Sequence, residues 1–231
     1  KGGYDATTLR VDEGATATIN GGTINNICDY TFAIENHGTT TVNGGEFKSI
    51  HTTAANYGTM TINGGSFTCN GLEGITAHAL RAAAGKTTIN GGTFDGKDNY
   101  NGFNVDADKG AVVDITGGKF LPVHSGSLYG EGTINVTGGE FFDDPSARLV
   151  NGYEAVQGEY GYYTIQYLPE AKIGETIYST LTEAFNVGGN IELLHDVTLS
   201  NSIVVDDDKN IILDLGNHTI TGPDAARDSE G

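Results

Sequence analysis

The chain has 231 residues, and its 30 acidic side chains outnumber its 12 lysines and arginines, which gives a formal net charge of -18 at pH 7. This acidic balance argues against a nucleic-acid partner and against binding to anionic membrane surfaces. No apolar run is long enough to cross a bilayer, so the sequence also argues against membrane insertion.

A phrase of the type Ile-Asn-Gly-Gly-x-Phe organises the first part of the chain. Its first glycine stands at positions 21, 44, 64, 91, 117 and 138, so the copies follow one another at steps of 23, 20, 27, 26 and 21 residues. An internal repeat of this length is typical of a solenoid, in which each repeat contacts only its neighbours.

Around each phrase the residues alternate with a period of two, which predicts short strands with one buried and one solvated face. The aliphatic residue before Asn-Gly-Gly and the aromatic residue after it are expected to point inward, as at Ile62 and Phe67. The glycine pair supplies the bend between the two strands. The residues one and three positions before the aliphatic residue are expected to point outward, and four of them are candidate binding residues: Thr39, Thr41, Thr59 and Thr61.

These features predict an all-β fold in which residues 1–150 form the coils of a single-stranded parallel β-helix, a solenoid. Differences in coil length are expected to fall in loops on one side, at residues 71–84 and 95–101. The outward threonine ranks also resemble an ice-binding surface. Lys86, Val112 and Asp114 interrupt the ranks, however, and threonine is a good strand residue in any case.

Residues 151–168 predict a β-hairpin cap, because two alternating stretches flank a turn with glycines at positions 158 and 161. A cap at this place would cover the last coil. Clustered tyrosines can anchor a protein partner or stack on sugars, although packing against the last coil is an equally good interpretation. The candidate binding residues are Tyr153, Tyr160, Tyr162 and Tyr163.

Residues 169–231 predict the start of a second β-helix-type unit with a short helix and strands. The helix is expected at residues 181–186, with Thr180 as its N-cap and Glu183 near capping-box spacing. Strands are expected at 191–194, 197–199, 203–205 and 211–215, and residues 217–222 begin another coil. Residues 223–231 are expected to be disordered.

Two stretches resemble known sequences. Residues 141–165 contain Gly-Tyr and a final Tyr-Thr-Ile after an Asp-Pro-Ser, and residues 171–222 contain Leu-Leu-His-Asp-Val-Thr-Leu and Leu-Asp-Leu-Gly-Asn-His-Thr-Ile-Thr-Gly. With the repeats, these motifs resemble the right-handed parallel β-helix repeat regions, pectate-lyase-like in architecture, of adhesin-like surface proteins of gut Firmicutes. In that pattern the helix-capped unit precedes the coils, whereas here it follows them. The resemblance therefore implies a piece of a tandem array on a bacterial cell wall, in which adjacent copies contact end to end.

The sequence offers no convincing catalytic group. Asp143-Asp144 resembles a carboxylate pair for glycoside hydrolysis, but it precedes Pro145 and is better interpreted as a turn. Asn36-His37-Gly38 is likewise interpreted as a turn between strands. We expect no cofactor and no metal. Two sets of acidic residues could bind Ca²⁺, namely Asp206–Asp208 and the set Asp95, Asp98, Asp106 and Asp108. Neither set has a known calcium-binding spacing, so the sequence does not support a Ca²⁺ site.

The favoured function is that of a non-catalytic, extracellular adhesion module at the bacterial cell surface, which contacts a host protein or a glycan. An immunoglobulin is one possible host protein. The alternative is a carbohydrate-active enzyme of the same architecture, a polysaccharide lyase or glycoside hydrolase. A group of buried acidic and basic residues in a groove across the coils would favour the enzyme, whereas a smooth face of Thr, Asn and Tyr would favour the binder.

Overall fold

The computed structural model describes residues 6–28, 30–71, 76–97 and 102–223 and divides the chain into two compact units. One unit holds residues 1–150 and 154–166, and the other holds residues 151–153 and 167–231. The domain boundaries predicted after residues 150 and 168 remain predictions. Asp98 and the disorder expected beyond Pro223 fall outside the described residues.

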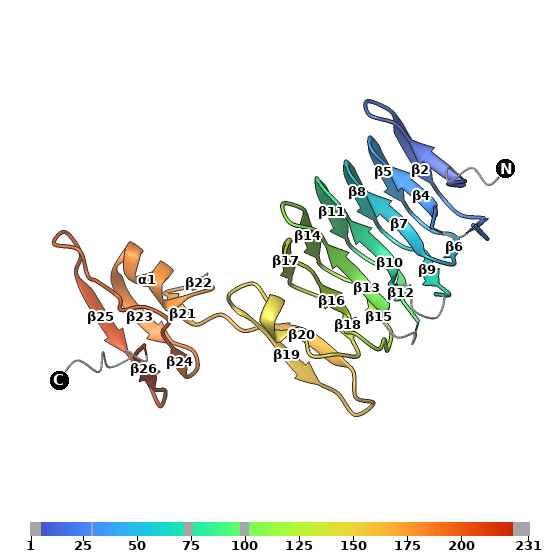
Figure 1. The fold of residues 1–231 in the computed structure, drawn as a ribbon. Helices are drawn as coiled ribbons and strands as arrows, with labels where there is room; N and C mark the ends of the chain where they lie inside the picture. The colour runs from blue at the N-terminus through green and yellow to red at the C-terminus, as the bar shows by residue number, and fades with distance from the viewer. Residues whose placement is uncertain (1–5, 29, 72–75, 98–101, 224–231) are drawn as a thin grey trace, which may run out of the picture. The chain divides into compact units, whose positions relative to one another are not determined.

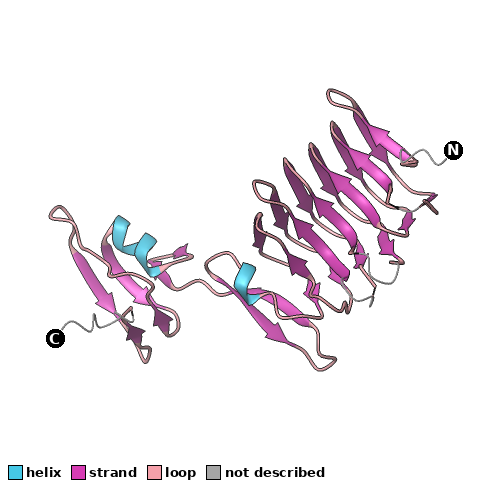
Figure 2. Ribbon diagram, viewed as in Figure 1, coloured by secondary structure: helices cyan, strands magenta, loops and turns pink. Residues whose placement is uncertain are grey.

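The first unit is a parallel β-solenoid, which confirms the predicted fold (Figures 1 and 2). Each coil adds one strand to each of three parallel sheets, which we name A, B and C. Sheet A contains β1 (Leu9–Val11), β4 (Phe32–Asn36), β7 (Thr52–Asn56), β10 (Ala77–Ala82), β13 (Gly102–Ala107) and β16 (Leu128–Tyr129). Sheet B contains β2 (Thr16–Ile19), β5 (Thr39–Val42), β8 (Thr59–Ile62), β11 (Lys86–Ile89), β14 (Val112–Ile115) and β17 (Thr133–Val136). Sheet C contains β3 (Thr23–Asn25), β6 (Glu46–Ser49), β9 (Ser66–Cys69), β12 (Thr93–Asp95), β15 (Lys119–Phe120) and β18 (Glu140–Phe141), followed by the hairpin strands β20 (Tyr163–Tyr167) and β19 (Tyr153–Gln157).

The core of the solenoid is built from ladders of identical positions, as the alternation predicts. The phenylalanines after the glycine pairs are fully buried, and Phe94 stacks on Phe67 at 5.2 Å and on Phe120 at 5.0 Å between ring centroids. The aliphatic residues before the glycine pairs, such as Ile62 and Ile89, are buried in sheet B. Each coil therefore buries its apolar face only because the next coil covers it.

The two glycines of each phrase are needed for different reasons. The second adopts a positive φ, for example 102° at Gly65, which side chains with a Cβ rarely tolerate. The first approaches the preceding coil: a Cβ at Gly117 would lie 2.3 Å from the carbonyl oxygen of Asn90. The two glycines thus form a bend at which the backbones of successive coils can stack closely.

The prediction of a loop at residues 71–84 is wrong in part, because this range contains strand β10 (Ala77–Ala82). Sequence reasoning found sheets B and C, which carry the repeated phrase, but it missed sheet A. The strands of sheet A share no phrase, because most of their outward residues differ from coil to coil. The differences in coil length fall in the connections from sheet C to sheet A, such as the one between β9 and β10.

The hairpin continues sheet C, since β20 pairs antiparallel with β18 and β19 lies beyond it. Tyr163 and Ile165 of β20 pack against the core of the solenoid. A 3-10 turn, η1 (Ser146–Arg148), precedes the hairpin. The predicted hairpin cap is therefore confirmed.

The second unit opens with an antiparallel pair, β21 (Ala171–Ile173) and β22 (Thr176–Tyr178). The predicted helix is confirmed as α1 (Leu181–Val187), with the capping box between Thr180 and Glu183. The remaining strands are β23 (Gly189–Leu193), β24 (Val197–Thr198), β25 (Ile211–Asp214) and β26 (Ile220–Thr221).

The second unit also contains parallel strand pairs, because β23 pairs with β25 and β24 pairs with β26. Ile191 lies opposite Leu213, a step of 22 residues that matches a solenoid coil. The strand predicted at residues 203–205 is absent, and Val204 there is 76% exposed, with no neighbouring strand paired to it among the described residues. Among the described residues, no helix has the length and apolar character needed to cross a membrane.

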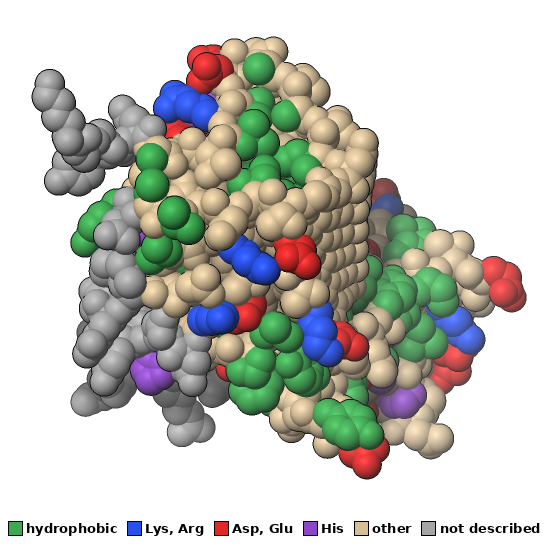
Figure 3. All heavy atoms as spheres, turned by 90° about the vertical axis from the view of Figure 1, so that its right-hand side faces the viewer, with side chains coloured by type: hydrophobic (Ala, Val, Ile, Leu, Met, Phe, Trp, Pro, Cys, Tyr) green, Lys and Arg blue, Asp and Glu red, His purple; other side chains and the backbone are tan. Residues whose placement is uncertain are grey.

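Several basic side chains on the surface are paired with an acidic one. Figure 3 shows basic and acidic groups lying next to each other on the face drawn there. The ion pairs of the first unit include Lys119 with Glu140 at 2.8 Å and Lys48 with Glu46 at 3.1 Å. The excess of negative charge is thus not gathered into a single field on that face.

Candidate binding face on sheet A

The outward face of sheet A carries a different side chain on each strand. Strand register places Glu35, Ala55, Arg81, Asp106 and Tyr129 opposite one another along the stack. The neighbouring positions form the inward ladder, with Leu80 and Val105 fully buried. The sheet therefore uses one side of each strand for a regular core and leaves the other side free to vary.

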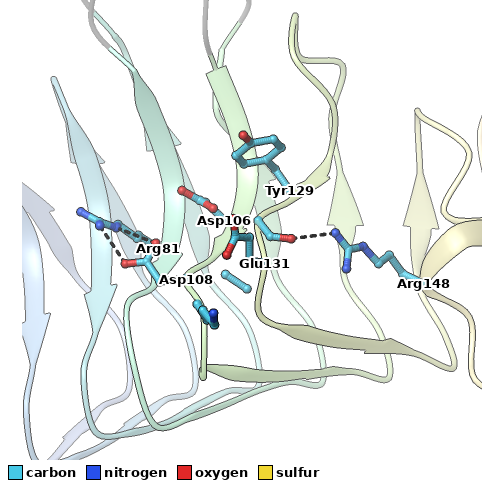
Figure 4. A pocket seen from close by; sticks show the side chains of 9 residues that line it. Arg81, Asp106, Asp108, Tyr129, Glu131 and Arg148 are labelled. Carbon is cyan, nitrogen blue, oxygen red and sulfur yellow. Dashed lines mark hydrogen bonds and ion pairs between the residues drawn. The ribbon is translucent and has the colours of Figure 1, made fainter.

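Two shallow hollows lie on this face and share Arg81, Asp106 and Tyr129 as their common wall. The first, which we call the His78 hollow, is also lined by His51, Thr76, His78 and Phe103. The second, which we call the Arg148 hollow, is also lined by Ala107, Asp108, Lys109, Gly130, Glu131 and Arg148 (Figure 4). Their volumes of about 470 and 440 Å³ fall within the range of ligand pockets.

Arg81 pairs with Asp108 and not with its register neighbour Asp106. Its Nη2 donates to the Asp108 Oδ2 at 2.7 Å, and its Nε lies 3.4 Å from Oδ1 (Figure 4). The hydrogen bond to Asp108 raises the pKa of Arg81. The guanidinium of Arg81 is thus held by Asp108.

Asp106 is nine-tenths buried, with 9% of its surface exposed. Gly130 approaches it closely: a Cβ there would lie 2.7 Å from the Asp106 Oδ1 and 2.0 Å from the carbonyl oxygen of Ala107, and the φ of Gly130 is +105°. Burial raises the pKa of Asp106, and the nearby charge of Asp108 raises it further, against the opposing effect of Arg81. The carboxyl group is held in a place where it is costly to ionise.

His78 lies beside this carboxyl group, with its Nδ1 3.5 Å from the Asp106 Oδ2. The residue is 6% exposed, and its Nδ1 has no hydrogen-bond partner within the described part of the chain. Burial and, to a smaller extent, the charges of Arg81 and His51 lower the pKa of His78 to about 4, against the opposing effect of Asp108. His78 is therefore a neutral imidazole at neutral pH. The pKa of His51 is lowered as well, by burial and by Arg81.

A stack of rings crosses the same face. His78 stacks on Phe103 at 5.8 Å between centroids, and Phe103 stacks on Tyr129 at 4.3 Å with an angle of 18° between the planes. Tyr129 belongs to β16, the last strand of sheet A, and is 53% exposed. An aromatic surface thus lies directly beside the Asp106 and His78 side chains.

The Arg148 hollow carries charges of both signs. The Nη2 of Arg148 donates to the carbonyl oxygen of Gly130 at 2.9 Å (Figure 4). Three acidic residues, Asp106, Asp108 and Glu131, are matched by three basic ones, Arg81, Lys109 and Arg148. The two hollows together offer hydrogen-bond donors, acceptors and a ring surface with no net charge.

The threonines singled out from the sequence lie on sheet B, away from this face. Thr39 and Thr59 are exposed, and Thr41 and Thr61 are half-buried. They form in-register pairs between β5 and β8, as predicted for an outward rank. Their role in binding stays a prediction.

The four tyrosines singled out from the sequence have different surroundings, and one of them belongs to the second unit. Tyr160 is 86% exposed in the hairpin turn, whereas Tyr163 packs against the core. Tyr162 lies under the Lys119 Nζ, which is 4.4 Å from its ring centroid. Tyr153 belongs to the second unit and contacts Tyr167 at 5.1 Å between centroids. Their role in binding also stays a prediction.

Asp143 and Asp144, which precede Pro145, accept hydrogen bonds from different residues. Asp144 accepts hydrogen bonds from Ser146, as expected for a turn. Asp143 accepts one from the buried Ser127 at 2.7 Å. His37 lies in the bend after β4, as predicted, and stacks on Tyr57 at 4.6 Å.

The residues considered for Ca²⁺ are spread over the chain. Asp106 and Asp108 share the sheet A face, Asp95 ends β12, and Asp206–Asp208 are exposed in the second unit. Within the residues that the structure describes, no three His, Cys, Asp or Glu side chains come together as a metal-binding group.

Sequence reasoning missed the face of sheet A, because it aligned the chain on Asn-Gly-Gly alone. A weaker signal precedes two of the sheet B strands, β5 and β8: Asn36-His37-Gly38 and Asn56-Tyr57-Gly58 share one pattern. Counting back from such patterns would have found the inward Ile34 and Ala54 and, beside them, the variable outward positions. Where the pattern changes, as near Arg81, the signal is lost.

Comparison with known proteins adds no relative. No protein-family model, no curated protein and no solved structure matches the chain. The structural basis of the functional interpretation is therefore the parallel β-solenoid and the face of sheet A.

Proposed function

We propose that the chain is a non-catalytic, extracellular binding module and that it holds a glycan on the outward face of sheet A. One observation carries this proposal. The ring stack that ends in the half-exposed Tyr129 lies beside the buried Asp106 and His78, whose side chains line the same hollow. Sugars need both elements, because a pyranose presents an apolar C–H face and a set of hydroxyl groups.

The balance of charge on this face favours a neutral glycan. Acidic and basic side chains around the two hollows are equal in number, so neither a polyanion nor a polycation gains a long-range attraction there. The net charge of -18 on the whole chain further disfavours an acidic polysaccharide.

The resemblance of residues 141–165 and 171–222 to adhesin-like, pectate-lyase-like repeat regions of gut Firmicutes supports a place on the bacterial cell surface. In a tandem array, linked copies bind a polymeric or cell-bound glycan with an avidity about 10² to 10⁴ times that of one copy. A weak, shallow site on each copy is sufficient for adhesion in such an array. A host protein, such as an immunoglobulin, is the competing ligand.

A carbohydrate-active enzyme is the second candidate, and the pKa of Asp106 favours it. A carboxyl group whose pKa is raised by burial and by a neighbouring carboxylate is suited to act as a general acid. Asp108 would then supply the second carboxylate. Because Arg81 occupies Asp108 through its hydrogen bond, the geometry supports binding better than hydrolysis.

The test pairs binding with turnover. The purified chain is applied to an array of neutral and acidic glycans and to serum proteins, and the same glycans are assayed for new reducing ends and for unsaturated products. The proposal predicts retention on one or more neutral glycans without product. Product formation that Asp106→Asn abolishes would replace the binding module with the enzyme, and retention of serum protein alone would replace the glycan with a host protein.

A further inference from the structure

We propose that His37 and Tyr57 form a second ring surface that contacts the same glycan as Tyr129, so that the ligand is an extended oligosaccharide and not a single terminal sugar. This inference rests on the proposed function, because it concerns the length and the shape of the glycan held on the face of sheet A. It places a binding site at residues that line neither of the two hollows described above.

The two rings lie in successive bends from sheet A to sheet B. The backbone N–H of His37 donates to the carbonyl oxygen of Val11, and that of Tyr57 donates to the carbonyl oxygen of Asn36, so each bend stacks on the preceding coil. The imidazole of His37 and the ring of Tyr57 stack at 4.6 Å between centroids, with 3° between their planes. Tyr57 is 36% exposed, and 30% of the His37 side chain is exposed, so a ligand can reach both rings.

Hydrogen bonds fix the orientation of the His37 ring. Its Nε2 donates to the Oε1 of Glu35 at 2.7 Å. The Oε2 of Glu35 accepts from the hydroxyl group of Thr7 at 3.1 Å, and the Nη1 of Arg10 lies 3.4 Å from Oε1. A ring held by a carboxylate that is itself held loses little conformational freedom when a ligand binds.

Both rings line a hollow of about 560 Å³, which we call the His37 hollow. Its other lining residues are Arg10, Asp12 and Glu13, and Arg10 pairs with Asp12 at 2.8 Å. The hollow thus places a ring surface beside hydrogen-bonding side chains, as the hollows around Tyr129 do. Because two of its charged residues are acidic and one is basic, it favours a neutral sugar over an acidic one.

The His37 hollow belongs to the same row of sheet A as the other two hollows. Arg10 stands at the first outward position of the row that ends at Tyr129. The pKa of Arg81, which lines both other hollows, is raised by Asp108 and to a smaller extent by the charge of Tyr57, so Tyr57 lies within electrostatic reach of it. Strand β7, which precedes Tyr57, and strand β16, which contains Tyr129, are three steps apart in the sheet, or about 14 Å.

This spacing selects the shape of the ligand. A pyranose in an extended β-1,4-linked chain advances by roughly the height of one coil, so about four residues reach from Tyr57 to Tyr129. Contact with one ring surface holds the rest of the chain at a high effective concentration near the other. A coiled α-1,4-linked chain does not keep its residues on a straight line and cannot follow the row. The ligand class is thus a neutral, extended β-1,4-linked oligosaccharide.

The experiment varies the length of the sugar and the two ring surfaces independently. The disaccharides and hexasaccharides of β-1,4-linked glucose, mannose and xylose are titrated into wild type, Tyr57→Ala, Tyr57→Phe and Tyr129→Ala. The α-1,4-linked glucose disaccharide and hexasaccharide control for chain shape, and Tyr160→Ala, in the hairpin turn, controls for the loss of an exposed tyrosine. Thermal unfolding of each variant checks the fold.

We expect at least one β-1,4-linked hexasaccharide to bind wild type at least about tenfold more tightly than its disaccharide. This advantage should disappear in Tyr57→Ala and in Tyr129→Ala, because either variant leaves one ring surface only. Tyr57→Phe, which keeps the ring, and Tyr160→Ala should retain it. The α-1,4-linked hexasaccharide should bind no more tightly than its disaccharide.

The outcomes separate the inference from the proposed function. If the hexasaccharides have no advantage in wild type, if Tyr57→Ala retains the advantage, or if the α-1,4-linked chain shows the same one, the inference is overturned while the binding face at Tyr129 stands. Retention of other neutral glycans on the array without any of the β-1,4-linked series has the same meaning. If the array retains no neutral glycan, both fail. If Tyr57→Ala unfolds, His37→Ala, which removes the other ring of the pair, decides the question.

Discussion

The inward positions of sheets B and C repeat an aliphatic or aromatic residue in every coil, whereas most outward positions of sheet A change from coil to coil. In sheet C, Phe47, Phe67, Phe94, Phe120 and Phe141 occupy one position and stack into a single ladder. In sheet A, the outward position is successively glutamate, alanine, arginine, aspartate and tyrosine.

The contrast separates two physical demands. A ladder requires identical side chains because each coil must cover the next at the same spacing, so repetition there reflects stacking. Stacking places no such demand on the outward side of sheet A, and the variation there leaves the Nδ1 of the buried His78 without a hydrogen-bond partner among the described residues. The function is therefore best sought where the repeat fails.

The largest loss is expected from an interruption of the phenylalanine ladder. Phe94→Ala removes a fully buried ring that lies between two others, and it should lower the free energy of unfolding by about 3–5 kcal/mol. Urea unfolding followed by circular dichroism measures it. Phe94→Leu, which fills most of the space, should cost much less, and equal losses in both variants would contradict a packing ladder.

A smaller loss is expected at the glycine bend, and the same phrase supplies its control. Gly117→Ala places a Cβ 2.3 Å from the carbonyl oxygen of Asn90, whereas Gly21→Ala meets nothing within 4 Å. The first substitution should cost up to about 3 kcal/mol through crowding and the second close to nothing. If both variants unfold at the same urea concentration, close stacking at the bend is not what selects glycine.

His78 should make the stability depend on pH on the acidic side. Its pKa is about 4 in the folded chain and about 6.5 when unfolded, so the unfolded chain binds more protons between these values. Stability is then greatest above pH 6.5 and falls as the pH drops towards 4, by about 2 kcal/mol between pH 7 and pH 5. The groups around His78 are Arg81, His51, Asp106 and Asp108.

The His78→Phe variant isolates this contribution. Urea unfolding should show that the loss of unfolding free energy between pH 7 and pH 5 is smaller in the variant by about 2 kcal/mol. At pH 7 the variant should be at least as stable as wild type, because no buried nitrogen remains unpaired. An unchanged slope would mean that His78 titrates normally in the folded chain.

The smallest effect is expected on sheet B. Thr61→Ala removes a half-buried, outward threonine and should change the free energy of unfolding by less than about 0.5 kcal/mol. It should leave glycan binding unchanged. A clear loss of binding in this variant, measured on the same array, would move the binding face from sheet A to the threonine rank.

Much of the solenoid was predictable, because the Ile62 and Phe67 positions recur with fixed offsets from two glycines. The helix at Leu181–Val187 was predictable from its capping residues Thr180 and Glu183. The strand β10 was not, because Ala77–Ala82 has neither the phrase nor a simple alternation: His78 faces the outer hollow while both Ala79 and Leu80 are buried in the core.

The candidate site was even less accessible to sequence reasoning. Asp106 and Asp108 were considered only as possible Ca²⁺ ligands, and nothing in the sequence shows that Asp108 pairs with Arg81, 27 residues away. Their meaning depends on strand register, since it places Arg81, Asp106 and Tyr129 side by side. Register across coils of unequal length cannot be read from single residues.

The most direct measurement compares two exposed tyrosines on the same glycan. Tyr129 ends the ring stack on sheet A and is 53% exposed, and Tyr160 lies in the hairpin turn and is 86% exposed. Titration of Tyr129→Ala and Tyr160→Ala with the glycan bound by wild type should show affinity reduced at least about tenfold for the first and unchanged for the second. The opposite result, loss at Tyr160 and none at Tyr129, would contradict a binding face on sheet A.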